Sequence, residues 1–113
     1  MVIFHNFFIY SCRVQMREIK VRFFTSLREI VNKREETLCF AEGENVTVDL
    51  VLKTLSQRYG TSFTEYVYNS KTAQPKNFLQ FLINGTATST LSGLETELKN
   101  GDVLAILPPV GGG

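Results

Sequence analysis

The sequence predicts an α+β domain in which a β-sheet packs against one long helix. Residues 17–24 alternate apolar and charged side chains, the period-two pattern of a half-buried strand. Residues 47–60 place apolar side chains at helical spacing, which indicates an amphipathic helix. Residues 103–107 form a continuous apolar run, as expected for a central strand that is buried on both faces. A chain of 113 residues, 43% of them apolar, fits one domain with one core.

The first half of the chain is predicted to hold a short helix between two strands. After the strand at 17–24, Ser26 is expected to cap a helix over residues 27–32, with Glu29 at the third position as in a capping box. Residues 36–41 contain Thr, Leu, Cys and Phe, which suit a second strand. The polar residues 42–45 are expected to form the turn after it.

The main helix is the clearest predicted element. Thr47 is a good N-cap, and Asp49 complements the positive end of the helix dipole. Gly60 is expected to end the helix. Residues 63–67 suggest another helical turn, and residues 69–77 read as a polar surface loop. The apolar stripe of the main helix is expected to be core, and it consists of Val48, Val51, Leu52, Leu55 and Tyr59.

The second half of the chain returns to β structure. Residues 78–83 are nearly all apolar and predict a strand, and Asn84-Gly85 is a turn signal before a further strand over 86–89. Three leucines between residues 91 and 98 indicate a loosely helical, buried connection to the strand at 103–107. The predicted order of elements is therefore β–α–β–α–β–β–β.

Residues 1–15 differ from the rest of the chain. They are apolar without a clear period, and Arg13 is their only charge. They lack the cationic start and the cleavage site of a signal peptide, and they are too short to span a bilayer. Because Met16 opens a more ordinary strand, we expect residues 1–15 to be an extension outside the core, with an extra strand as the alternative.

Charge and residue counts argue against several classes of function. The 12 basic and 11 acidic residues nearly cancel, so no basic surface is expected to recruit nucleic acid. Two cysteines, Cys12 and Cys39, cannot build a four-cysteine metal site, and no other metal site is indicated. We expect Cys39 to be a small core residue with a reduced thiol in the cytoplasm, and a disulfide between the two cysteines is the alternative. His5 is the only histidine, which leaves little material for acid–base relays.

The segment 108–113, Pro-Pro-Val-Gly-Gly-Gly, directly follows the last predicted strand. Pro109 fixes its own φ and lacks an amide donor, and it pushes Pro108 toward extended geometry. Gly111, Gly112 and Gly113 have no Cβ, so the walls of a partner's site can close on the backbone. Fully extended, the segment reaches roughly 20 Å. The alternative is a disordered end or a cloning remnant without function.

No other part of the chain offers a catalytic constellation. The glycines outside the tail are isolated and match no nucleotide-binding fingerprint, and Ser92-Gly93 lacks the flanks of a nucleophile elbow. We therefore expect the protein not to be an enzyme. Its predicted contribution is a terminal carboxylate that an enzyme can use.

Several motifs together resemble the MoaD/ThiS family of ubiquitin-like sulfur carriers, which includes the small subunit of molybdopterin synthase. The family is also close to small archaeal modifier proteins and to Urm1-type proteins. The resemblance runs from Met16 to Gly113 and is carried by Lys20–Phe24, Leu27–Ile30, Ile83-Asn84-Gly85, Leu94–Val103 and Leu107–Gly113.

This resemblance implies a β-grasp, or ubiquitin-like, fold with a mixed sheet. The implied organisation is an extension at 1–15, the domain at 16–107 and a flexible tail at 108–113. It also implies that a MoeB-like adenylyltransferase uses ATP and Mg to activate Gly113. Sulfur from a persulfide donor then displaces AMP and leaves a thiocarboxylate. No cofactor is expected to be bound stably.

The resemblance implies partner contacts around the tail as well. Pro108, Pro109, Val110, Gly111 and Gly112 are expected to enter a partner's channel. Beside them, Phe24 and Arg28 match family positions, and Leu107 stands where the family often has Phe. Phe24 and Leu107 are expected to anchor a partner, and Arg28 can pair with a partner carboxylate. The alternatives are core packing for Phe24 and Leu107 and a solvated helix surface for Arg28.

The resulting hypothesis is a cytoplasmic sulfur carrier for molybdenum cofactor synthesis, with a MoaE-like large subunit as its second partner and Gly113 as the reacting group. One alternative is a ubiquitin-like modifier that is joined through Gly113 to target lysines, or a sulfur carrier for tRNA thiolation. A third reading is a β-grasp interaction module with an incidental tail. No contact with nucleic acid or membrane is expected.

Overall fold

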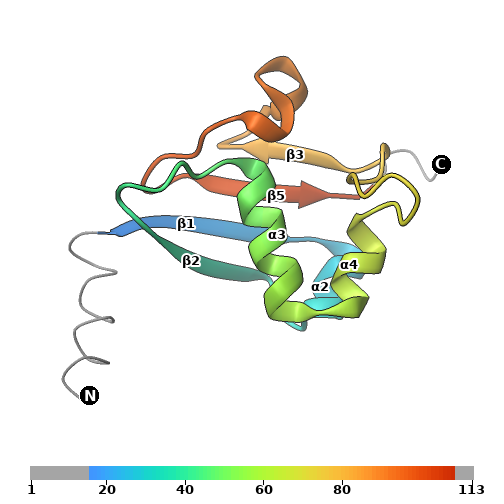
Figure 1. The fold of residues 1–113 in the computed structure, drawn as a ribbon. Coiled ribbons are helices and arrows are strands. Elements are labelled where there is room, and N and C mark those ends of the chain that lie inside the picture. Colours follow the sequence, from blue (N-terminus) through green and yellow to red (C-terminus); the bar gives the residue numbers. More distant parts are fainter. Residues whose placement is uncertain (1–15, 109–113) are drawn as a thin grey trace, which may run out of the picture.

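The computed structural model describes residues 16–108, which form one mixed sheet packed against a main helix (Figure 1). The sheet has five strands in the order β2-β1-β5-β3-β4. This arrangement confirms the predicted α+β class and the β-grasp fold. The elements are β1 (Met16–Phe23), α2 (Thr25–Val31), β2 (Glu35–Ala41), α3 (Val48–Tyr59), α4 (Thr61–Val67), β3 (Gln80–Ile83), β4 (Thr86–Ala87), the 3-10 helices η1 (Thr88–Thr90) and η2 (Gly93–Glu95), and β5 (Val103–Leu107).

The last strand lies in the middle of the sheet. β5 runs parallel to β1, with Phe23 opposite Ile106, and antiparallel to β3, with Gln80 opposite Leu107. Figure 1 shows that β1 and β5 point to the same side of the molecule. The ends of β1 and β5 and the beginning of β3 therefore meet at one edge of the domain, where the chain continues into Pro108.

The core lies between the sheet and the main helix. Alternate residues of the strands face inward, as their period-two pattern requires, and α3 buries one apolar stripe against them. Each fully buried aliphatic or aromatic side chain contributes about 1.5–3 kcal/mol relative to exposure. Side chains with no more than 1% exposure in these elements are Ile19, Val21, Phe23, Leu104, Ile106, Val48, Val51, Leu52 and Leu55.

The helix boundaries follow local signals only in part. Thr47 caps α3 as predicted, because its side chain accepts a hydrogen bond from the Leu50 amide at 3.2 Å, and Gly60 ends the helix at φ 81°. The prediction that Ser26 caps α2 is wrong. The carbonyl of Phe24 accepts from the amides of Leu27 and Arg28, so the first turn begins earlier and encloses Ser26.

The predicted strands at 78–83 and 86–89 are shorter in the structure. Phe78 precedes β3, in a turn where the amide of Leu79 donates to the carbonyl of Lys76 at 3.2 Å. Beyond Ala87 the chain enters η1 instead of extending β4. Leu91 is 51% exposed, so the connection from 91 to 98 is only partly buried.

Two predictions about burial are also wrong. Cys39 is not a core residue, because Leu38 and Phe40 face inward and leave Cys39 on the exposed face of β2. Cys39 is disulfide-bonded in the structure, whereas a reduced thiol was expected. Cys12 lies outside the described residues.

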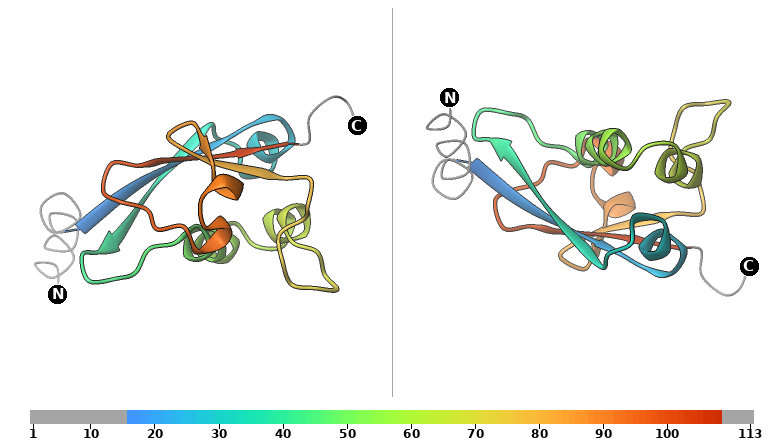
Figure 2. Two further views of the ribbon diagram at one scale, coloured as in Figure 1. Left: turned by 90° about the horizontal axis from the view of Figure 1, so that it is seen from above. Right: turned by 90° about the horizontal axis from the view of Figure 1, so that it is seen from below.

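β5 buries one face only, whereas burial on both faces was predicted. Leu104 and Ile106 are in the core, whereas Val103, Ala105 and Leu107 are half-buried. Figure 2 shows the reason: α3 and α4 lie on the same side of the sheet. The central position was predicted correctly, but a central strand needs helices on both sides for both faces to be buried.

Candidate functional site

The candidate site is the edge of the domain from which the C-terminal segment leaves. We call this surface the tail root and define it by Phe24, Phe78, Leu107 and Pro108. The register places Phe24 just beyond the Phe23–Ile106 pair and places the start of β3 opposite Leu107. Residues 109–113 lie outside the described residues, so the roles expected for Pro109, Val110, Gly111, Gly112 and Gly113 stay predictions.

Two of the predicted anchors lie next to each other in this surface. Phe24 has extended backbone at the junction between β1 and α2, and Leu107 ends β5. Both are half-buried, as is Pro108, so each keeps some apolar surface for a partner. The structure therefore brings Phe24 and Leu107 together as expected, and their part in binding stays a prediction.

Arg28 lies in the last turn of α2 and is half-buried. Its Nε atom is buried and has no hydrogen-bond partner among residues 16–108. A buried donor without a partner is costly. Because Nε is shielded from solvent, it does not itself offer a donor to another protein, and the pairing of Arg28 with a partner carboxylate stays a prediction.

Phe78 is the tail-root residue that sequence reasoning missed. Its side chain is 48% exposed, although the sequence suggested a strand residue. The Nζ atom of Lys76 lies 5.9 Å from the ring centroid, and this amine also donates to the carbonyl of Glu65 at 2.7 Å. The signal that could have found it is the turn-forming sequence Pro75-Lys76-Asn77, which leaves the next residue at the mouth of the strand.

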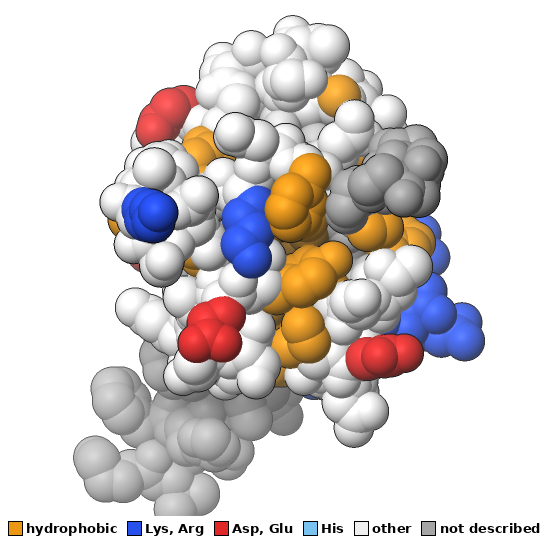
Figure 3. Space-filling view, turned by 90° about the vertical axis from the view of Figure 1, so that its right-hand side faces the viewer, with side chains coloured by type: hydrophobic (Ala, Val, Ile, Leu, Met, Phe, Trp, Pro, Cys, Tyr) orange, Lys and Arg blue, Asp and Glu red, His pale blue; other side chains and the backbone are white. Residues whose placement is uncertain are grey.

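Figure 3 shows apolar side chains gathered on the side of the molecule where α4 and the end of β5 lie, with charged groups around them. An apolar patch with a charged rim is typical of a protein-binding surface. Among residues 16–108 no group of three or more His, Cys, Asp or Glu residues could hold a metal ion. The described helices also include none that is long and apolar enough to cross a membrane.

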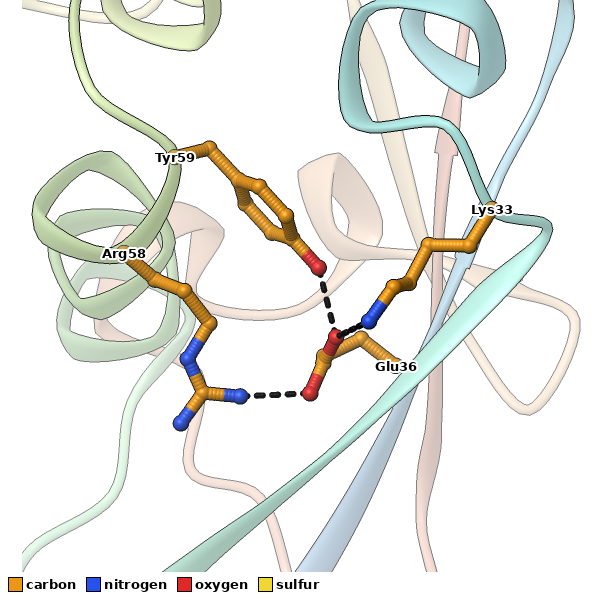
Figure 4. A network of polar contacts seen from close by, with 4 residues as sticks. All are labelled: Lys33, Glu36, Arg58 and Tyr59. Atoms are coloured by element: carbon orange, nitrogen blue, oxygen red, sulfur yellow. Dashed lines mark hydrogen bonds and ion pairs between the residues drawn. The ribbon is translucent and has the colours of Figure 1, made fainter.

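The most connected polar cluster surrounds Glu36, which joins β2 to the end of α3 (Figure 4). One carboxylate oxygen accepts hydrogen bonds from Lys33 Nζ, at 2.8 Å, and from the Tyr59 hydroxyl, and the other accepts from Arg58. Burial acts to raise the pKa of Glu36, but the hydrogen bonds from Lys33 and Tyr59 and the charges of Lys33 and Arg58 hold it below its usual value. Because both oxygens are engaged, we assign this cluster to stability rather than to catalysis.

A second polar feature is the groove between α3 and residues 64–73. Two of its hydroxyl atoms, Ser56 Oγ and Tyr68 Oη, are buried without a hydrogen-bond partner among the described residues. Burial, followed by the charge of Asp49, raises the pKa of Tyr68 to about 12. The Tyr68 hydroxyl therefore stays protonated at neutral pH and can donate a hydrogen bond.

The fold and the tail root together define a ubiquitin-like protein of the β-grasp type. A family model described as the ThiS family matches residues 21–113, and the chain therefore belongs to the ThiS family.

Known relatives agree with this assignment. Small archaeal modifier protein 3 of Haloferax volcanii is 29% identical over 96 residues, which cover 85% of this chain and 99% of the relative. A protein of Archaeoglobus fulgidus, provisionally named a sulfur carrier protein, is 32% identical over 72 residues, 64% of this chain and 80% of the relative. The solution structure of small archaeal modifier protein 1 from Methanosarcina acetivorans has a TM-score of 0.71 and 36% identity, and covers 87% of this chain and 98% of that chain.

Proposed function

We propose that this protein is a sulfur carrier whose Gly113 carboxylate is converted to a thiocarboxylate. The observation that carries the proposal is the family match, which extends from the first strand through the C-terminal glycines. The geometry supports it, because β5 is held on both sides by β1 and β3 and leads directly into Pro108. A fixed base and a stiff proline segment reduce the entropy lost when a partner binds the tail.

The proposed chemistry takes place in partner enzymes. An adenylyltransferase binds ATP with Mg and joins AMP to the Gly113 carboxylate, with release of pyrophosphate. The terminal sulfur of a persulfide then attacks the acyl carbon, AMP leaves, and an acyl disulfide to the donor is formed. A thiol of the donor or the partner enzyme attacks the donor sulfur, which breaks the S–S bond, leaves a disulfide on the enzyme side and releases the Gly113 thiocarboxylate. The carrier contributes no acid or base to these steps. It contributes the carboxylate, the tail that enters the partner's channel and the tail root that the partner contacts.

We further propose that the sulfur is used for molybdopterin synthesis in the cytoplasm, with a MoaE-like large subunit as the acceptor enzyme. The same activated tail also suits a second function, in which Gly113 is joined to lysines of other proteins. The similarity to small archaeal modifier proteins of two organisms favours this alternative specifically.

Mass spectrometry of the native protein separates the two functions. For a carrier we expect a fraction of molecules with one carboxylate oxygen replaced by sulfur, and loss of this species when the cognate adenylyltransferase is deleted. For a modifier we expect glycine remnants of this tail on lysines of other proteins. If the native protein shows neither product, both functions are contradicted. The remaining alternative is then a β-grasp interaction module whose tail has no function.

A further inference from the structure

We propose that Phe78, together with Lys76, is a docking element for the adenylyltransferase that activates Gly113, and that it fits an apolar pocket with a carboxylate at its rim. The inference rests on the proposed function and deepens it. It adds a contact on the β3 side of the tail root to Phe24 and Leu107, which lie on the β1 and β5 side.

The exposure of Phe78 is the first argument. Among residues 16–108, the exposed large apolar side chains are Phe78 and Leu91, with exposed fractions of 48% and 51%. An aromatic ring that stays half in water is a common anchor of protein interfaces, because it buries a large area at low entropy cost. Leu91 follows η1, which Figure 1 shows apart from the end of β5. Of these two residues, Phe78 therefore combines exposure with a position near the end of β5.

The second argument is that the segment holding Phe78 is fixed. The amide of Lys76 donates to the carbonyl of Val67 at 2.8 Å, and the amide of Leu79 donates back to the carbonyl of Lys76. The Lys76 side chain is tied to the end of α4 through the carbonyl of Glu65. A partner therefore meets a ring whose backbone is already ordered, which keeps the entropic cost of binding low.

The length of the tail identifies the occupant. Residues 109–113 span at most about 17 Å when fully extended, at about 3.3 Å each. An enzyme that encloses the Gly113 carboxylate must therefore come within this distance of the end of β5. Phe78 is two residues before Gln80, which lies opposite Leu107, so it falls inside the area that such an enzyme covers.

Charge indicates the chemistry of the partner's pocket. The ammonium group of Lys76 lies beside the ring of Phe78, and the one hydrogen bond that the structure shows for it goes to a neutral carbonyl. A carboxylate at the pocket rim would pair with this cation, whereas a basic rim would be repelled. The occupant is the adenylyltransferase, because activation of Gly113 precedes both the carrier and the modifier reactions.

The test is ATP–pyrophosphate exchange by the cognate adenylyltransferase, measured against the concentration of the full-length carrier. For Phe78→Ala we expect KM for the carrier to rise about tenfold, as for a buried aromatic anchor, with kcat nearly unchanged. Phe78→Leu should give a smaller rise, and Lys76→Gln should weaken the salt dependence of KM. Leu91→Ala is the matched control for loss of an exposed apolar side chain and should behave like the wild type.

The outcomes are distinguishable. Equal KM values for the wild type and Phe78→Ala would overturn the docking role, and so would a defect confined to a later acceptor reaction. If the wild type itself supports no exchange, the proposed activation of Gly113 fails and the docking role fails with it. Because Phe78 lies outside the core, its variants should unfold at nearly the wild-type temperature, and a large drop would show a structural role instead.

Discussion

Replacing Glu36 by Gln should destabilise the domain at neutral pH. The Glu36 side chain is only 11% exposed and receives hydrogen bonds from Lys33, Arg58 and Tyr59. Lys33 and Arg58 are about half exposed, so water screens both pairs, and only the pair with Arg58 is counted, at about 0.2–1 kcal/mol. The partly buried bond from Tyr59 to the carboxylate adds about 1.5 kcal/mol. The sum predicts a loss of about 2 kcal/mol, or about 10 °C in the unfolding midpoint.

The stability that Glu36 contributes should depend on pH. Because the pKa of Glu36 is lowered in the folded state, its contribution is complete above the unfolded value of about 4.3 and is lost as the pH falls through the folded value. The difference between the wild type and Glu36→Gln should therefore be largest near neutral pH and should narrow below about pH 4.

Thermal unfolding followed by circular dichroism from neutral to acidic pH measures the loss of stability in Glu36→Gln and its change with pH. Glu35→Gln is the matched control, since it removes the same charge from the neighbouring residue. Glu35 is 44% exposed and pairs with Lys20 and Arg22 at 3.6 and 4.0 Å, so we expect less than about 0.5 kcal/mol. Equal losses in the two variants, or a loss for Glu36→Gln that persists unchanged at low pH, would refute the reasoning.

Three further predictions concern the tail and its base. Deleting Gly112-Gly113 should abolish ATP–pyrophosphate exchange and leave the unfolding temperature unchanged; measurable exchange would exclude Gly113 as the reacting group. If Arg28 pairs with a partner carboxylate as the family resemblance implies, Arg28→Ala should raise KM for the carrier several-fold, and an unchanged KM would assign Arg28 to structure alone. Thr47→Ala should cost about 1 kcal/mol in urea unfolding without affecting exchange, since it removes only the cap of α3.

Local patterns predicted the elements that depend on neighbouring residues. The alternation in β1 and the pair Thr47 and Gly60 at the ends of α3 are properties of short stretches, and the structure confirms them. The side of the sheet on which Cys39 lies could also have been derived, because Leu38 and Phe40 must face the core and their neighbour must face outward.

Features set by distant parts of the chain could not be predicted. The cluster around Glu36 joins it to Arg58 and Tyr59, which lie 22 and 23 positions further along the chain. No local sequence pattern indicates contacts over such a separation. The apolar run from Phe78 read as one strand, but the ladder with β5 begins only at the pair Gln80–Leu107. Strand pairing, not hydrophobicity, therefore decided that Phe78 is exposed at the tail root and not part of the sheet.

The placement of β5 separates folding from the chemistry proposed for the tail. Leu104 and Ile106 are core residues, and β5 pairs with strands on both sides, so the strand is part of the folding unit. The ladder ends at Leu107, and neither Pro108 nor Pro109 has an amide hydrogen with which to extend it. Changes beyond Pro109 should therefore alter reaction with partners without altering stability. A tail variant that lost stability would show that these residues pack on the domain, and would contradict a tail that is free to enter an enzyme.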